Sequence, residues 1–234
     1  MKIDEGNCTR CRSCIIYCPV SAIKTGENRV LIDQDLCVEC GVCLKSGACK
    51  FDALHQPPLE WPRILRSQFS DPLISHPSTG IMGRGTAEMK TNDVTGRFRL
   101  GEVGFAIEMG RPGISTSMVD VEKVFKALIG EVEFEPLNPV TYLFDLEEGE
   151  FRDPRVRGER ALSAIIECKT TEENGVRVLN ILREVSEEID TVFTLCVVNR
   201  CRDHEIPFKR VMEEEGFTPR INGKTNVGLG RPLA

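Results

Sequence analysis

The stretch Cys8-Thr9-Arg10-Cys11-Arg12-Ser13-Cys14-Ile15-Ile16-Tyr17-Cys18-Pro19 decides the fold of the first part of the chain. It places three cysteines at two-residue intervals, a fourth after three more residues, and a proline directly behind the fourth. A second run repeats the two-residue intervals with Cys37, Cys40 and Cys43, and ends at Cys49. Thiolates are soft ligands, and groups of four at such spacing are typical of metal–sulfur centres. The sequence therefore predicts two ligand runs.

The two runs resemble those of the bacterial-type ferredoxins that carry two [4Fe-4S] clusters, and the resemblance covers residues 1–54, about a quarter of the chain. It implies that each run lends its fourth cysteine to the cluster of the other run. The implied ligands of the first cluster are Cys8, Cys11, Cys14 and Cys49. The implied ligands of the second cluster are Cys37, Cys40, Cys43 and Cys18.

Four thiolates close the coordination of each implied cluster, so that no position is open to a substrate. The resemblance therefore implies single-electron transfer, with a redox protein as the partner. One feature departs from the family pattern. Five residues, Leu44 to Ala48, separate Cys43 from Cys49, and Lys50 replaces the usual proline. We expect these extra residues to bulge the turn near the first cluster.

Disulfides and zinc sites are the alternatives for eight cysteines near an N-terminus. The opening Met1-Lys2-Ile3-Asp4-Glu5 lacks the apolar segment of a secretory signal. Structural zinc sites rarely combine three cysteines at two-residue spacing with a fourth three residues on. The chain also has no apolar run of roughly 18 residues or more, so no membrane association is expected. We expect a cytoplasmic protein of an anaerobe, because exposed low-potential clusters are sensitive to oxygen.

The charge of the chain argues against nucleic acid as a partner. The formal net charge is −6, and two oxidised clusters of about −2 each bring the loaded protein to about −10. Residues 100–151 hold eleven acidic residues and three basic ones, whereas phosphate backbones require basic surfaces. This acidic block is either a solvated face or a docking surface for a basic redox partner.

The 234 residues have room for a cluster module and one further domain. We predict an α+β protein in three parts: a two-cluster ferredoxin module at 1–54, a connector and loop rich in proline and glycine at 55–96, and a plait domain with a C-terminal extension at 97–234. Prolines recur so often in residues 55–80 that no helix of normal length is expected there. The apolar residues of this segment predict that it packs along both domains.

Hydrophobic periodicity organises the remainder. It predicts helices at 119–129 and 174–189, and extended segments at 97–109, 132–134, 140–146, 161–168 and 191–198. The resulting β-α-β-β-α-β order is that of a split plait, with both helices on one face of a four-stranded antiparallel sheet. The order resembles the ACT and related small-molecule-sensing plaits. An uncovered sheet face or edge predicts a homodimer or a subunit of a complex.

The glycine-rich stretch from Gly80 to Gly101 is the least ordinary sequence outside the cysteines. Its glycines permit close backbone approach, and the basic residues Arg84, Lys90 and Arg97 suit an anionic small-molecule ligand. An ordinary surface loop or a clamp between domains would explain the same residues. The stretch contains no dinucleotide-binding or Walker motif. Of the three remaining cysteines, Cys168 and Cys196 fall on apolar strand patterns, which predicts burial, and Cys201 lies near basic residues.

Two classes of function remain. In the first, the protein is an electron-transfer subunit whose clusters exchange single electrons with an oxidoreductase. In the second, the plait binds a small molecule, and the protein is a redox-linked sensor or a reductase. The closed coordination of both implied clusters and the lack of a nameable catalytic group favour the first.

Overall fold

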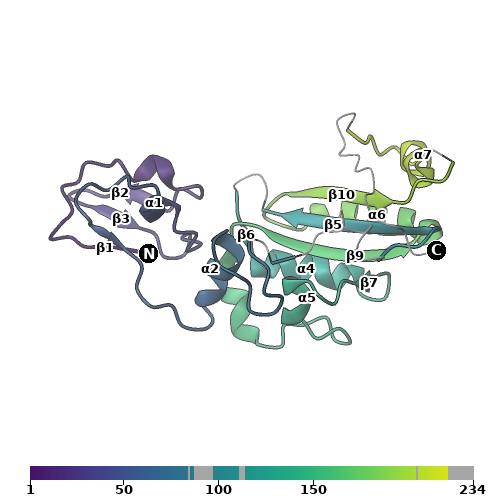
Figure 1. Cartoon of the computed structure of the whole chain (residues 1–234), viewed down its shortest axis with the longest axis horizontal. Helices are drawn as coiled ribbons and strands as arrows, with labels where there is room; N and C mark the ends of the chain where they lie inside the picture. The colour runs from purple at the N-terminus through teal and green to yellow at the C-terminus, as the bar shows by residue number, and fades with distance from the viewer. Residues whose placement is uncertain (84, 87–96, 111–113, 204, 221–234) are drawn as a thin grey trace.

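The computed structural model describes residues 1–83, 85–86, 97–110, 114–203 and 205–220. Figure 1 shows a small module of short strands at the N-terminal end and a larger body built on one sheet, with helix α2 between them. None of the helices in the described residues is long and apolar enough to cross a bilayer.

The N-terminal module contains two antiparallel strand pairs. Strand β1 (Lys2–Ile3) pairs with β4 (Leu54–His55), and β2 (Ile23–Thr25) pairs with β3 (Val30–Ile32). A single 3₁₀ turn, η1 (Ile15–Tyr17), lies within the first cysteine run, and a single helical turn, α1 (Val42–Lys45), lies within the second. The small apolar core includes ligand candidates as well as ordinary core residues: Met1, Ala22, Ile23, Val30, Cys37, Cys43 and Leu54.

The module is an internal repeat. The carbonyl of Asp4 accepts a hydrogen bond from the N–H of Cys8, and the carbonyl of Asp33 accepts one from Cys37, each at 3.0 Å. Left-handed backbone recurs at matching places in the two halves: Arg10, Arg12 and Ser21 in the first, and Glu39, Gly41 and Asp52 in the second. Equivalent residues of the two halves are 29 positions apart in the sequence before the extra turn and 31 positions apart after it. The longer second run is thus absorbed in the turn after α1, where Gly47 has a φ of 65°.

The larger body is built on a four-stranded antiparallel sheet. Its strands are β5 (Glu102–Met109), β7 (Glu133–Phe134), β9 (Ala164–Thr171) and β10 (Phe193–Asn199), in the order β10-β5-β9-β7. A second, two-stranded sheet pairs β6 (Thr116–Ser117) with β8 (Arg160–Ala161). The main helices are α4 (Met118–Leu128) and α6 (Glu172–Ser186), with shorter turns at α5 (Pro139–Leu143), η3 (Pro154–Gly158) and α7 (Pro207–Glu214).

The residues of β5 that pack in the core show which face of the sheet is covered by helices. Val103, Phe105 and Ile107 are fully buried, and they belong to one core with the apolar residues of α4 and α6. Because successive strand residues point to opposite faces, this set lines the helix side of the sheet. A polar side chain caps the start of each of these two helices: Ser117 accepts a hydrogen bond from the N–H of Asp120, and Thr171 accepts one from the N–H of Asn174.

Two expectations from the sequence are wrong. Residues 140–143 are helical, because Asn138 caps α5 and Pro139 occupies its first turn, where no backbone N–H is needed. Cys196 is exposed, since it pairs with Ala106 on the sheet face away from α4 and α6. The connector contains one short helix, α2 (Ile64–Ser70), whose seven residues fit between the prolines at 62 and 72.

Helix α2 packs into the larger body. Leu65 and Phe69 are buried within the same core as β5. The boundaries 1–54, 55–96 and 97–234 stay a prediction, and this packing assigns α2 by contact to the third part. The connector contacts both neighbours: Trp61 Nε1 donates a hydrogen bond to Asp153 of the larger body at 2.6 Å, and Arg63 donates one to Glu39 of the module at 2.6 Å.

Candidate functional site

Two cavities in the module are each lined by four cysteines. Cys8, Cys11, Cys14 and Cys49 line the first, and Cys18, Cys37, Cys40 and Cys43 line the second. Each cavity thus collects three cysteines of one run and the last cysteine of the other. The exchange follows from the strand pairing, because β4 runs back beside β1 and brings the end of the second run next to the start of the first.

The fourth cysteine of each run is held in the same way. The N–H of Ala22 donates to Cys18 Sγ at 3.1 Å, and the N–H of Ala53 donates to Cys49 Sγ at 3.3 Å. Both bonds span four residues and follow a residue with left-handed backbone, Ser21 or Asp52. Backbone N–H groups directed at sulfur favour the charged form of the ligand and, in cluster proteins, raise the reduction potential.

The cavities differ in exposure. Cys11 in the first is exposed, whereas Cys37, Cys40 and Cys43 in the second are buried. Burial, with a smaller contribution from the neighbouring cysteines, raises the pKa of Cys43 to about 12. Burial likewise raises the pKa of Cys37, Cys40 and Cys14. Thiolates gathered in such a cavity repel one another, and a cationic centre between them is needed to keep them ionised.

The donor set and the lining fit iron–sulfur clusters. Each cavity offers four sulfur ligands, and its remaining walls are almost wholly apolar, with Ile3, Val30 and Leu54 in the first and Ala22, Ile23 and Ile32 in the second. Soft thiolates select iron–sulfur centres and zinc among biological metals. Apolar walls exclude water from such a centre.

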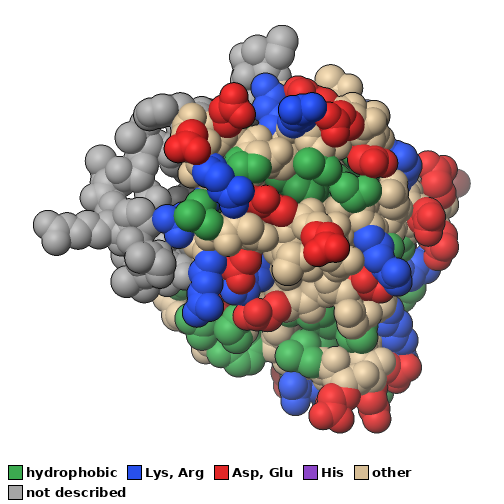
Figure 2. All heavy atoms as spheres, turned by 90° about the vertical axis from the view of Figure 1, so that its right-hand side faces the viewer, with side chains coloured by type: hydrophobic (Ala, Val, Ile, Leu, Met, Phe, Trp, Pro, Cys, Tyr) green, Lys and Arg blue, Asp and Glu red, His purple; other side chains and the backbone are tan. Residues whose placement is uncertain are grey.

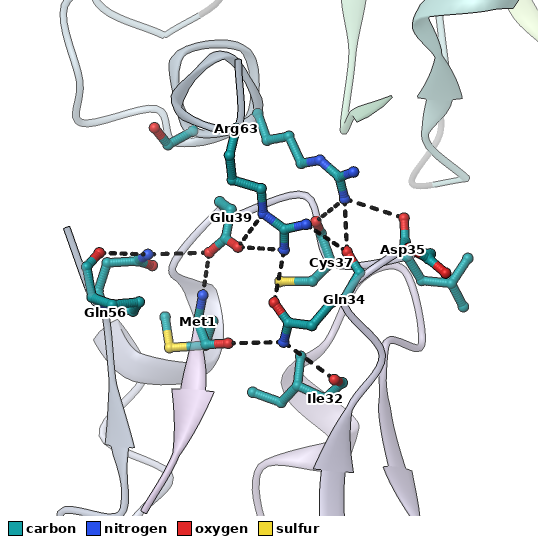
Figure 3. A network of polar contacts seen from close by, with 12 residues as sticks. Met1, Ile32, Gln34, Asp35, Cys37, Glu39, Gln56 and Arg63 are labelled. Atoms are coloured by element: carbon teal, nitrogen blue, oxygen red, sulfur yellow. Dashed lines mark hydrogen bonds and ion pairs between the residues drawn. The ribbon is translucent and has the colours of Figure 1, made fainter. Parts of the chain in front are cut away.

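A polar network stands beside the second cavity (Figure 3). Glu39, which lies between Cys37 and Cys40, is only 2 % exposed. Its carboxylate accepts hydrogen bonds from the N-terminal ammonium of Met1, from Arg63 at 2.6 and 2.9 Å, and from Gln56 at 3.1 Å. Burial alone would raise the pKa of Glu39, but Met1 and Arg63 outweigh that cost and hold it below its ordinary value.

Arg66 connects the second cavity to the larger body. Its guanidinium donates to the carbonyls of Cys37 at 2.8 Å and Gln34 at 2.9 Å, and forms an ion pair with Glu159. The side chain is almost fully buried. A third contact of this interface is the ion pair between Lys45 and Asp71. The joint between module and body is therefore made by the second half of the module.

Sequence reasoning missed this network. Arg63 and Arg66 lie in a connector whose prolines concealed a helix, and nothing local relates them to Cys37. The position of Glu39 between two ligand cysteines was the signal that could have revealed the network. A buried carboxylate beside a negatively charged cluster requires basic side chains to neutralise it.

The residues suggested for an anion site are only partly described. Arg84 and Lys90 lie outside the described residues. Arg97 forms an ion pair with Glu135 at 2.9 Å, and its Nη1 is buried without a hydrogen-bond partner among the described residues. The expectation of an anion site at these three residues therefore stays a prediction.

The acidic block is partly neutralised. Glu131 pairs with Arg177 at 2.6 Å, Glu135 pairs with Arg97, and Glu133 lies 3.7 Å from Lys169. Figure 2 shows acidic and basic side chains interspersed on the end of the molecule away from the module. The mixture is typical of a solvated face.

Comparisons with known proteins agree with the geometry of the module. The model of the 4Fe-4S binding domain matches residues 1–24. "Ferredoxin 7Fe" of Hydrogenibacillus schlegelii is 38 % identical over 61 residues, which are 25 % of this chain and 76 % of that protein. "Ferredoxin-3" of Chlorobaculum tepidum is 43 % identical over 49 residues, 21 % of this chain and 77 % of that protein.

A larger relative is matched in part. A tetrathionate reductase subunit of Archaeoglobus fulgidus is 41 % identical over 56 residues, which cover 23 % of this chain and 26 % of that protein. No solved structure matches the chain. The ferredoxin relatives are covered over three quarters of their length by the residues that carry the cysteine-lined cavities. Through its N-terminal residues, about 60 in number, the chain belongs to the ferredoxin family and has an iron–sulfur electron-transfer role.

Proposed function

We propose that the chain carries two [4Fe-4S] clusters and passes single electrons through them as a subunit of an oxidoreductase. The first cluster is bound by Cys8, Cys11, Cys14 and Cys49, and the second by Cys18, Cys37, Cys40 and Cys43. The single observation that carries the proposal is the presence of two cavities, each lined by one of these sets. The repeated backbone of the two halves supports a count of two.

The clusters supply one-electron chemistry, and the residues of the chain determine where the electrons enter and leave. The buried thiols and apolar walls keep water from the second cavity. Arg66, with its guanidinium on the Cys37 carbonyl, brings positive charge to that site and favours the reduced state. Its ion pair with Glu159 makes the second cavity the one that faces the larger body.

The larger body is proposed as a split plait that docks the module on a catalytic subunit. The sheet order β10-β5-β9-β7 and the placement of α4 and α6 support the plait. The partial match to an oxidoreductase subunit supports the docking role. The cytoplasm of an anaerobe is proposed as the setting, because the exposed Cys11 makes the first cluster accessible to oxygen.

Iron and labile-sulfide analysis of anaerobically reconstituted protein tests the cluster count. We expect about eight irons per chain, since each [4Fe-4S] cluster holds four. About four irons with one paramagnetic centre contradicts the proposal, and about seven identifies one three-iron cluster, as the name of the Hydrogenibacillus relative suggests.

The exchange of ligands is tested with a matched pair of variants. Cys18→Ser should damage the second cluster and leave the first, whereas Cys49→Ser should do the reverse, because each residue lines the cavity of the other run. Electron paramagnetic resonance of the reduced proteins distinguishes the two spectra. Loss of the same signal in both variants refutes the assignment.

A homodimer is the proposed assembly. Strand β10 is an edge of the sheet, seven residues long, and carries no charged side chain, so that it lacks the usual protection against pairing. Light scattering of the full chain at micromolar concentration should give the mass of two chains. A mass of one chain contradicts the proposal.

A ligand pocket in the larger body is the second candidate, and it is favoured by the buried Nη1 of Arg97, which has no hydrogen-bond partner in the described part of the chain. A melting screen of carboxylate and phosphate metabolites should then give a saturable rise in Tm that Arg97→Gln abolishes. Absence of any shift removes this candidate.

A further inference from the structure

Equivalent positions in the two halves of the module are used in opposite ways. Glu39 follows Arg10 by 29 residues, and both have left-handed backbone, with φ of 55° and 63°. In the second half, Glu39 is buried and its carboxylate accepts hydrogen bonds from Arg63 of the same chain. Arg10 is exposed and forms no ion pair within the described residues.

The mouth of the first cavity is locally basic in an acidic protein. Residues 8–14 and 48–52 contain Arg10, Arg12 and Lys50 against the single acid Asp52, a net charge of +2, whereas the whole chain carries −6. All four side chains are exposed, and the three cations form no ion pair in the part of the chain that the structure describes. These charges offset the charge of about −2 of an oxidised cluster.

The same mouth gives access to the cluster ligands. Cys11 is the exposed ligand candidate, and Arg12 and Phe51 line its cavity. Phe51 is 47 % exposed, so that an apolar side chain stands among the cations. An apolar centre within a charged rim is the usual composition of a protein docking site.

We propose that this first-cluster face, made of Arg10, Cys11, Arg12, Lys50 and Phe51, docks an acidic one-electron carrier protein. The proposal rests on the two-cluster function above. A carboxylate of the partner pairs with Arg10, in the way that Arg63 pairs with Glu39 on the other half. One electron then moves between the first cluster and the redox centre of the partner, and no covalent bond is made or broken.

Charge complementarity predicts that the partner is acidic at the surface that docks. Long-range attraction steers a charged partner to the region of opposite charge and raises the association rate. The acidic block is a weaker candidate for docking, because Glu131, Glu133 and Glu135 already have basic neighbours. A basic partner at that block is the competing outcome of the test.

The test uses the full chain, reconstituted anaerobically, with iron and sulfide counted first. Failure to form clusters contradicts the proposed function, whereas the measurements below concern the docking face alone. The variant is Arg10→Asn/Arg12→Asn, since asparagine tolerates left-handed backbone. The control is Lys209→Gln/Arg210→Gln on α7, which removes the same charge far along the chain on exposed residues whose ion pairs are local.

Stopped-flow oxidation of the reduced protein by substoichiometric hexacyanoferrate(III) measures the local field. We expect Arg10 and Arg12 to make the rate for the wild type higher than the rate for the variant, and this difference to shrink as salt rises, because salt screens the attraction between the arginines and the anion. The rate for the variant at low salt should fall roughly three- to ten-fold, and the rate for the control should stay unchanged. Equal rates for the wild type and the variant at low salt, or an equal fall for the variant and the control, overturns the proposal.

Competition with charged polypeptides identifies the kind of partner. Poly-L-glutamate should slow the oxidation of the wild type by occupying the first-cluster face, and should have no effect on the arginine variant. Inhibition by poly-L-lysine with none by poly-L-glutamate indicates a basic partner and refutes the proposal.

Discussion

Replacement of Arg66 by methionine should separate the module from the larger body. Arg66 is buried, and it satisfies Glu159 and the carbonyls of Gln34 and Cys37 together. Methionine keeps the length of the side chain but leaves a buried carboxylate without its cation. Removal of one member of a buried ion pair costs about 3–5 kcal/mol of folding free energy. We expect the loss for Arg66→Met to lie in this range.

Urea denaturation followed by tryptophan fluorescence measures this loss. Trp61 is the only tryptophan of the chain, and its hydrogen bond to Asp153 joins the connector to the larger body. The control is Arg177→Met, whose pair with Glu131 is largely exposed on the arginine side and should contribute less than about 1 kcal/mol. Arg66→Lys keeps the positive charge but lacks the planar guanidinium, which donates several hydrogen bonds at once. Its loss of folding free energy should lie between those of the wild type and Arg66→Met.

A double-mutant cycle separates the ion pair from the other bonds. If the pair dominates, Arg66→Met/Glu159→Gln should be more stable than the sum of the single changes predicts, by roughly 0.5–3 kcal/mol. Losses for Arg66→Met and Arg177→Met that are equal and below about 1 kcal/mol refute the argument, since they mean that Arg66 is effectively solvated.

Two further predictions concern the stability of the larger body. Burial lowers the pKa of His76 to about 4, so that the folded state resists protonation while the unfolded state, with an ordinary value of about 6.5, takes up a proton as pH falls. Stability is lost as pH falls through 6.5 towards 4, by about 1.4 kcal/mol between pH 8 and pH 5.5. His76→Asn should remove this increment in urea titrations at the two pH values, and an undiminished pH dependence contradicts the assignment. Gly110→Ala should destabilise the protein by about 2 kcal/mol or more, because its φ is 78° and a Cβ would lie 2.8 Å from the carbonyl oxygen of Leu162. Gly101→Ala, with a φ of 86° and open space, should cost only about 1 kcal/mol, and equal losses would show that the contact is relieved.

Features that depend on the local spacing of residues could be predicted from the sequence alone. Cysteines two residues apart lie close enough in the chain to bind one centre, so the ligand runs could be recognised, and their resemblance to bacterial-type ferredoxins implied the module. Periodicity likewise predicted β5, α4, β9, α6 and β10, since each has apolar residues at the spacing of its element, and those of β10 are partly buried against the core. The short helix α5 was predicted as extended, because five residues hold too little periodic signal to outweigh their β-branched and aromatic composition.

The contact between the module and the larger body could not be predicted from the sequence, because it joins residues that are far apart in the chain. Arg66 and Glu159 are 93 residues apart in the chain, and no pattern within either neighbourhood relates them. The same holds for Arg63 and Glu39, and for the contrast between Glu39 and Arg10. Cys196 shows the physical reason most simply. Its apolar strand pattern predicted burial, but whether a strand residue is buried depends on what covers its face of the sheet, and on this strand α4 and α6 cover the other face.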